Sequence, residues 1–175
     1  MKTKAAAILV GSIFLLSILF LSGNVEKNVF GEKEKTATIK NPQFVAELLP
    51  VNPFSNGSQA HGEAFFKLGD NDEMNYVVNA YNIANVSGVM ISLFEGAPPK
   101  DGITLRSATT EGLSGPVDGT LVAGNFTSQD FREDLRGYSM LDLVKSFLDG
   151  NIVVRINTPS SPLAEIYGYI EPNTD

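Results

Sequence analysis

The chain has 175 residues, of which 20 are acidic and 13 basic, giving a net charge of −7 at pH 7. This acidic balance disfavours nucleic acid and anionic membrane surfaces as partners, because both are bound through clustered Lys and Arg. The absence of cysteine excludes disulfides, thiol catalysis and a lipid-modified cysteine anchor, so the domain must be held together by packing alone.

Residues 1–23 are typical of a secretory leader. Lys2 and Lys4 precede an uncharged apolar run, and small residues close it at Ser22 and Gly23. The run is also long enough to span a bilayer, so a cleaved signal peptide and an uncleaved N-terminal membrane anchor both remain open. Either alternative places the body outside the cytoplasm, secreted or anchored on the outer face of the cell membrane. Residues 24–41 are rich in Glu and Lys and predict a polar, flexible tether.

The domain proper is predicted over residues 42–171, and it opens with strands. The alternation of apolar and polar residues predicts a first strand over 44–50, ending at Pro50. Residues 61–68 and 73–83 are two further strand patterns. The sequence Gly-Asp-Asn-Asp at 69–72 is a strong turn signal, so these two strands are expected to form a hairpin.

Residues 84–88 interrupt the strand pattern, and a strand over 89–95 follows. The Pro-rich stretch 96–102 predicts a loop that does not extend the sheet. Beyond it we expect a short edge strand over 103–105 and a longer strand over 117–126.

One helix is predicted late in the chain. Ser139 is a candidate N-cap with Asp142 three residues on, and the apolar residues that follow recur at helical spacing until Asp149-Gly150. A single amphipathic turn is also expected over residues 130–135.

The chain closes on a hairpin of two strands, over 152–158 and 164–171, joined by a Pro/Ser loop. In the second strand Ile166, Gly168 and Ile170 alternate with Tyr167 and Tyr169, so the first set is expected to face the core. Many short strands and one short helix before the C-terminal hairpin predict an all-β fold, either an antiparallel sandwich or a Greek-key barrel.

Four motifs in this order resemble the CHRD domain, the module named after the extracellular antagonist chordin and also found in microbial exported proteins. They are Phe-Val-Ala-Glu-Leu from Phe44, Gly-Ala-Pro from Gly96, a Leu-rich helix ending in Asp-Gly-Asn at Asn151, and Glu-Ile-Tyr-Gly-Tyr-Ile from Glu165. The resemblance covers residues 43–170 and implies a β domain.

The chain departs from that family at three positions. The family commonly has a His-x-His pair before the Gly-Ala-Pro turn and a His after the Val-rich strand, an arrangement like that of copper/zinc superoxide dismutase. Here Ser92, Phe94 and Asn157 stand at those positions. The resemblance therefore implies no copper or zinc site in this chain.

Few residues are candidates for chemistry. His61 is the only histidine, and with no cysteine beside it we interpret it as an ordinary strand or loop residue rather than a metal ligand or a triad base. Residues 70–73 hold three carboxylates, which suit calcium, but they also suit an ordinary hairpin turn. Arg155 and Glu165 are expected to pair across the closing hairpin.

Two other features concern the surface. Asn56, Asn85 and Asn125 begin N-x-[ST] sequons, the first two in predicted loops. Tyr167 and Tyr169 lie on the strand face opposite the core and form a candidate contact surface.

The sequence thus predicts a non-enzymatic exported module that binds an extracellular protein or envelope component, with no catalytic residues, metal or cofactor. A degenerate relative of a metal-binding β-barrel, retaining some metal or calcium binding, is the alternative. A purely structural envelope component is a third hypothesis.

Overall fold

The computed structural model describes residues 36–50, 57–94, 100–107, 113–132 and 135–174. The leader and most of the tether lie outside the described residues, so those predictions stay predictions. Among the described residues, no helix has the length and apolar character needed to cross a membrane.

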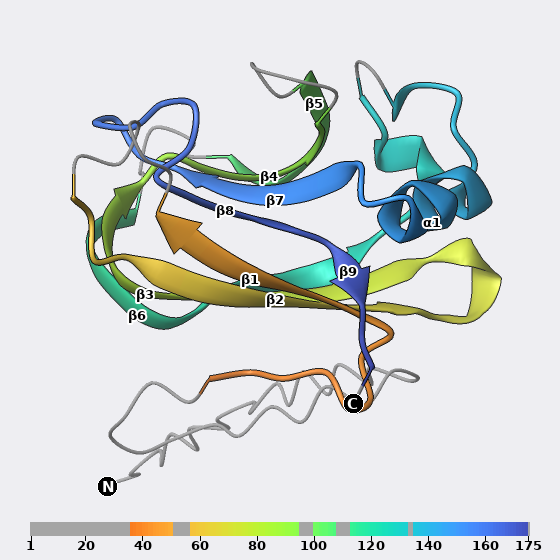
Figure 1. Ribbon diagram of the computed structural model, residues 1–175, viewed down its shortest axis with the longest axis horizontal. Helices are drawn as coiled ribbons and strands as arrows, with labels where there is room; N and C mark the ends of the chain where they lie inside the picture. Colours follow the sequence, from red (N-terminus) through yellow and green to blue (C-terminus); the bar gives the residue numbers. More distant parts are fainter. Residues whose placement is uncertain (1–35, 51–56, 95–99, 108–112, 133–134, 175) are drawn as a thin grey trace, which may run out of the picture.

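The described elements are nine strands, one α-helix and two 3-10 turns (Figure 1). In chain order the strands are β1 Phe44–Pro50, β2 His61–Leu68, β3 Met74–Val86, β4 Gly88–Leu93, β5 Lys100–Ser107, β6 Leu113–Phe126, β7 Ile152–Asn157, β8 Ile166–Tyr169 and β9 Glu171–Pro172. The helix is α1 Met140–Leu148, and the 3-10 turns are η1 Asp70–Asp72 and η2 Ser128–Asp130.

All strand pairs are antiparallel, in the order β5-β4-β7-β8-β1-β2-β3-β6, with β9 added beside β1. The sheet folds over into two layers, with β4, β7 and β8 above β1, β2, β3 and β6 (Figure 1). Strand β1 joins the layers, because Phe44 to Leu48 pair with β2 whereas Leu49 and Pro50 pair with β8. The prediction of an antiparallel β-sandwich or barrel with one short helix is confirmed.

The predicted interruption at residues 84–88 is wrong. Strand β3 continues to Val86, and β4 begins two residues later. Asn82 and Asn85 have positive φ angles of 52° and 56°, and the register with β6 shifts around them. These bulges bend the strand instead of ending it, so β3 carries the chain directly from one layer to the other.

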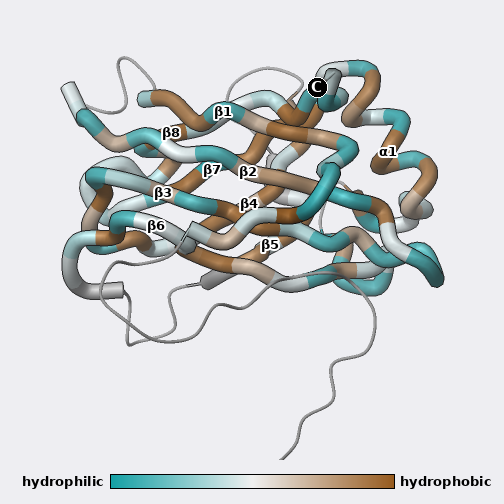
Figure 2. Tube along the Cα trace, turned by 90° about the horizontal axis from the view of Figure 1, so that it is seen from below, coloured by the Kyte–Doolittle hydropathy of each residue, from teal (hydrophilic) through white to brown (hydrophobic). Residues whose placement is uncertain are grey.

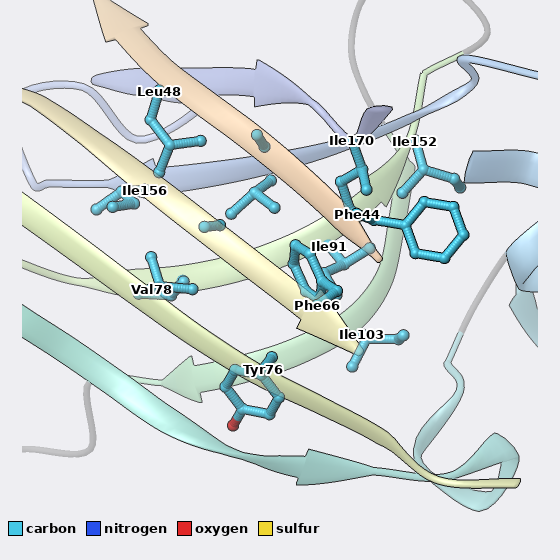
Figure 3. Close-up of a cluster of buried hydrophobic side chains, with 14 of the residues drawn as sticks. Phe44, Leu48, Phe66, Tyr76, Val78, Ile91, Ile103, Ile152, Ile156 and Ile170 are labelled. Atoms are coloured by element: carbon cyan, nitrogen blue, oxygen red, sulfur yellow. The ribbon is translucent and has the colours of Figure 1, made fainter. Parts of the chain in front are cut away.

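The core lies between the two layers and follows the period of two that the sequence shows. Side chains from both layers meet there, among them Leu48, Phe66, Val78, Ile91 and Ile156 (Figure 3). Seen from the side of β1, β2, β3 and β6, the strands change between hydrophilic and hydrophobic residues along their length (Figure 2). Alternate side chains of these strands therefore point into the core.

Helix α1 covers one end of the sandwich (Figure 1). As predicted, Ser139 caps it: the Ser139 Oγ accepts from the Asp142 N–H, and the Asp142 carboxylate accepts from the Ser139 N–H and O–H. Phe147 then packs against Phe44 and Phe66, with ring centroids 5.2 and 5.8 Å apart. The helix thereby seals the core at the end where β1 begins.

The helical turn expected over 130–135 lies partly outside the described residues, which break off after Arg132 and resume at Leu135. Just before it, Ser128–Asp130 form η2, which Thr127 and Asp130 cap. One smaller prediction needs correction. Strand β5 is longer than predicted and begins at Lys100, inside the stretch 96–102 that was expected to be loop.

The segment 36–41, predicted as part of a flexible tether, lies against the outer face of the lower layer. Ile39 is buried, the Ala37 N–H donates to Thr120 Oγ1 over 2.6 Å, and Asn79 Nδ2 donates to the Ala37 carbonyl over 3.0 Å. The folded unit therefore includes residues before Pro42.

Candidate functional site

The outer face of β4, β7 and β8 holds most of the positions that the sequence singles out. The strand registers align Met90, Arg155, Tyr167 and Leu49 in one row across four strands. The neighbouring row contains Ser92, Val153 and Tyr169.

Arg155 lies at the centre of this face and is only 5% exposed. Its Nε donates to Ser92 Oγ over 2.8 Å, and its Nη1 donates to the Leu163 carbonyl and, over 3.4 Å, to Asn157 Oδ1. Its Nη2 contacts the Met90 sulfur at 3.3 Å. A guanidinium is an always-charged planar donor, so these bonds fix a buried positive charge beneath the face.

The three positions that the motif resemblance sets against histidines all belong to this region. Ser92 and Asn157 lie beside Arg155 and accept its hydrogen bonds, while Phe94 follows the end of β4. Hydroxyl, amide and phenyl groups are poor ligands for copper or zinc, and a fixed guanidinium repels a second cation at this range. We call Arg155 together with its hydrogen-bond partners Ser92, Asn157 and Leu163 the arginine socket.

The expected pair between Arg155 and Glu165 is wrong. The register places Arg155 opposite Tyr167, and Glu165 accepts instead from Ser58 and Thr158, over 2.7 and 2.6 Å. These two bonds tie the loop after β7 to the segment before β2. Glu165 is therefore a structural residue of the loop region.

An exposed aromatic group adjoins the arginine socket. Phe94 and Tyr167 stack with ring centroids 6.3 Å apart, and Tyr169 meets both rings edge-on at 5.7 and 6.0 Å. Tyr169 is 37% exposed and Leu49, next to Tyr167 in the register, is 49% exposed. We call Leu49, Phe94, Tyr167 and Tyr169 the aromatic face. Partial desolvation, with a smaller contribution from Tyr167, raises the pKa of Tyr169 above its ordinary value.

The parity predicted for the closing strand is confirmed. Ile166, Gly168 and Ile170 are buried, whereas Tyr167 is half-buried and Tyr169 exposed. Tyr167 and Tyr169 therefore lie outside the core as predicted, and Phe94 and Leu49 adjoin them. Phe94 and Leu49 belong to the aromatic face because β4 and β1 lie in the same layer as β8 at this point, which the sequence pattern does not reveal.

The other candidate residues lie elsewhere. His61 begins β2 on the outer face of the lower layer, where its ring stacks on Tyr81 at 5.2 Å. Asp70 and Asp72 are exposed in η1, and Glu73 accepts from Asn125. Within the described part of the chain, no three His, Cys, Asp or Glu side chains gather closely enough to hold a metal ion.

Two sequons can be placed. Asn85 lies within β3, at an exposed bulge position, and not in the predicted loop. Asn125 lies in β6 and donates to Glu73. Asn56 lies outside the described residues.

Comparison of the chain with protein-family models, curated proteins and solved structures finds no match. The resemblance to the CHRD domain therefore remains a prediction from the motifs.

Proposed function

We propose that this chain is an exported, non-enzymatic binding module that engages an extracellular protein or envelope component through the aromatic face. The observation that supports the proposal is that three rings pack on one another outside the core, with Tyr169 and Leu49 presented to solvent. Exposed aromatic residues favour contact surfaces because a rigid ring contributes a large apolar area and loses little conformational entropy on binding.

The setting of the aromatic face also suits recognition. Its residues come from β8, from the end of β1 and from the position just after β4, and a hydrogen bond of Arg155 links the neighbouring strands β7 and β4. A surface fixed in this way needs little ordering when a partner binds, which lowers the cost of association. Arg155 acts here as a support, because it is buried and its donors are directed to protein atoms.

The test measures binding of the purified protein to washed envelopes of the producing cells. Wild-type protein should bind saturably, and the Tyr167→Ser/Tyr169→Ser variant should bind at least 10-fold more weakly. Leu141→Ser is the matched control, since Leu141 is 76% exposed on α1 and is not a residue of the aromatic face. Thermal melts must show that all three proteins are folded. Equal binding of the tyrosine variant and the wild type would refute the proposal.

Export is tested separately. Protease added to intact cells should cleave the tether upstream of Thr36, because the leader predicts an external domain. If the domain is cleaved only after lysis, the external location is wrong, whatever the binding experiment gives.

A further inference from the structure

A surface pocket of about 600 Å³ lies on the outer face of the lower layer, on the other side of the sandwich from the aromatic face. Outward-facing side chains of β1 and β2 form its floor, and Tyr81 of β3 and residues near both ends of the domain form its walls. The lining residues are Pro42, Val45, Ala46, Glu47, His61, Gly62, Glu63, Phe65, Tyr81 and Asn173.

Two carboxylates face each other in this pocket. Glu47 of β1 and Glu63 of β2 are register partners, and residues directly opposite on neighbouring strands have Cβ atoms about 5 Å apart. Like charges in that relationship destabilise a sheet. A cation placed between the two carboxylates would remove the repulsion.

Glu63 is held in place by neutral groups. Asn79 Nδ2 donates to Glu63 Oε1 over 3.1 Å and the Tyr81 hydroxyl donates to the same oxygen over 3.4 Å. Asn79 is fully buried and is itself fixed by Thr120, whose hydroxyl donates to Asn79 Oδ1 over 2.9 Å. The carboxylate is thus oriented by donors that do not balance its charge.

Apart from Asn173, the rest of the pocket lining is aromatic or apolar. The stacked rings of His61 and Tyr81 flank Glu63, and Val45 and Phe65 face each other on the adjoining row. Aromatic faces attract cations, and hydrocarbon surface suits the body of an organic ligand. A hydrated calcium ion, which needs six to eight oxygen ligands, fits this lining poorly.

We propose that this pocket binds a primary alkylammonium ion, with the ammonium group between Glu47 and Glu63 and its hydrocarbon chain along the aromatic and apolar wall. The lysine side chain of a peptide and a free polyamine share this chemistry. The nearest described lysine on the same strand face, Lys67, donates to the Lys40 carbonyl over 3.2 Å. It is four residues from Glu63, a separation of about 13 Å along a strand.

The test exploits the fact that His61 is the only histidine and lines the pocket. Its imidazole ring protons therefore give one set of NMR signals that reports occupancy. The full chain is titrated at constant ionic strength with spermidine and, separately, with Nα-acetyl-lysine methylamide. A saturable shift of the His61 signals with either probe supports the proposal, and the probe that binds more tightly distinguishes a free polyamine from a peptide.

Matched controls distinguish recognition of the ammonium charge from a fit to the hydrocarbon chain alone. Glu63→Gln keeps the size of the side chain and should weaken binding at least 10-fold, whereas Glu73→Gln, at the turn end of the β2–β3 hairpin, should leave it unchanged. Nα-acetyl-norleucine methylamide, the neutral analogue of the lysine probe, should not bind. The proposal is overturned if neither amine gives a saturable shift, if Glu63→Gln binds as wild type, if the norleucine probe binds equally well, or if calcium chloride shifts the signals at lower concentration than the amines.

Discussion

Gly168 of β8 lies directly against the carbonyl oxygen of Glu47 in β1, and a Cβ at position 168 would overlap that oxygen. This close approach occurs where β8 inserts beside β1 and the two layers join. A glycine is needed here for space and not for an unusual backbone conformation.

Gly168→Ala should therefore destabilise the domain by about 3 kcal/mol, because the backbone of Glu47 cannot move as a flexible side chain can. Gly124→Ala on β6 is the matched control, since the atoms nearest to its added methyl group belong to the Tyr76 side chain, the closest at 3.1 Å. Urea unfolding of both variants measures the difference. Equal losses of stability would show that β1 can shift away from β8.

The two faces of β8 should respond differently to a charge. Ile166→Asp places a carboxylate in the fully buried core, which should cost several kcal/mol out of the ~5–15 kcal/mol that a domain usually has. Tyr167→Asp places the same charge on the outer face and should cost far less. Thermal melts decide between them. If Tyr167→Asp is equally damaging, the aromatic face is a part of the core.

The arginine socket should discriminate between arginine and lysine. Arg155→Lys keeps the positive charge but cannot donate to Ser92 and Leu163 with the same planar geometry, so we expect a loss of about 2 kcal/mol. Arg136→Lys, at an exposed position, should be neutral within about 0.5 kcal/mol. Chemical denaturation gives both values, and a neutral Arg155→Lys would mean that charge alone matters.

The start of α1 should make stability depend on acid pH. Hydrogen bonds from the Ser139 side chain and then from its backbone lower the pKa of Asp142 below its ordinary value of 3.8. A lowered folded-state pKa stabilises the fold above the unfolded-state pKa, and this contribution is lost as the pH falls through the folded-state value.

Ser139→Ala should therefore raise the pKa of Asp142 and cost about 1 kcal/mol at neutral pH through loss of the cap. The difference in stability between variant and wild type should shrink below pH 3.8. Carbonyl NMR titration of Asp142 and thermal melts at neutral and acid pH test this. An unchanged Asp142 pKa would argue against the capping box in solution.

Metal content tests the prediction that this chain holds no copper or zinc. With Ser92 and Asn157 bound to a guanidinium, the domain should purify without stoichiometric copper or zinc. Elemental analysis after dialysis measures this, and one retained equivalent of either metal would contradict it.

The local elements were predictable because their signals are local. The strand over His61–Leu68 follows from alternation, and the helix from the Ser139 cap and its apolar spacing. The run through residues 84–88 was not predictable, because Asn82 and Asn85 act there as bulge residues, although the same residue types also form turns.

Only part of the candidate site was predictable, because the other part depends on how strands pair. Alternation along one strand placed Tyr167 and Tyr169 outside the core, but the partners of those residues depend on strand order. Phe94 joins them, and Arg155 faces Tyr167 and not Glu165, because of a register that no single strand specifies.

The place of β8 in the middle of the sheet also has a consequence for synthesis. Strands β7 and β8 separate β4 from β1, yet both come after β1 to β6 in the chain. Until they emerge, the two parts of the sheet have no strand between them, and the pairing of β4 with β7 spans about sixty residues of chain. The domain is therefore expected to complete folding only when β7 and β8 are available to pair, and truncation before Ile166 should abolish the fold instead of trimming its edge.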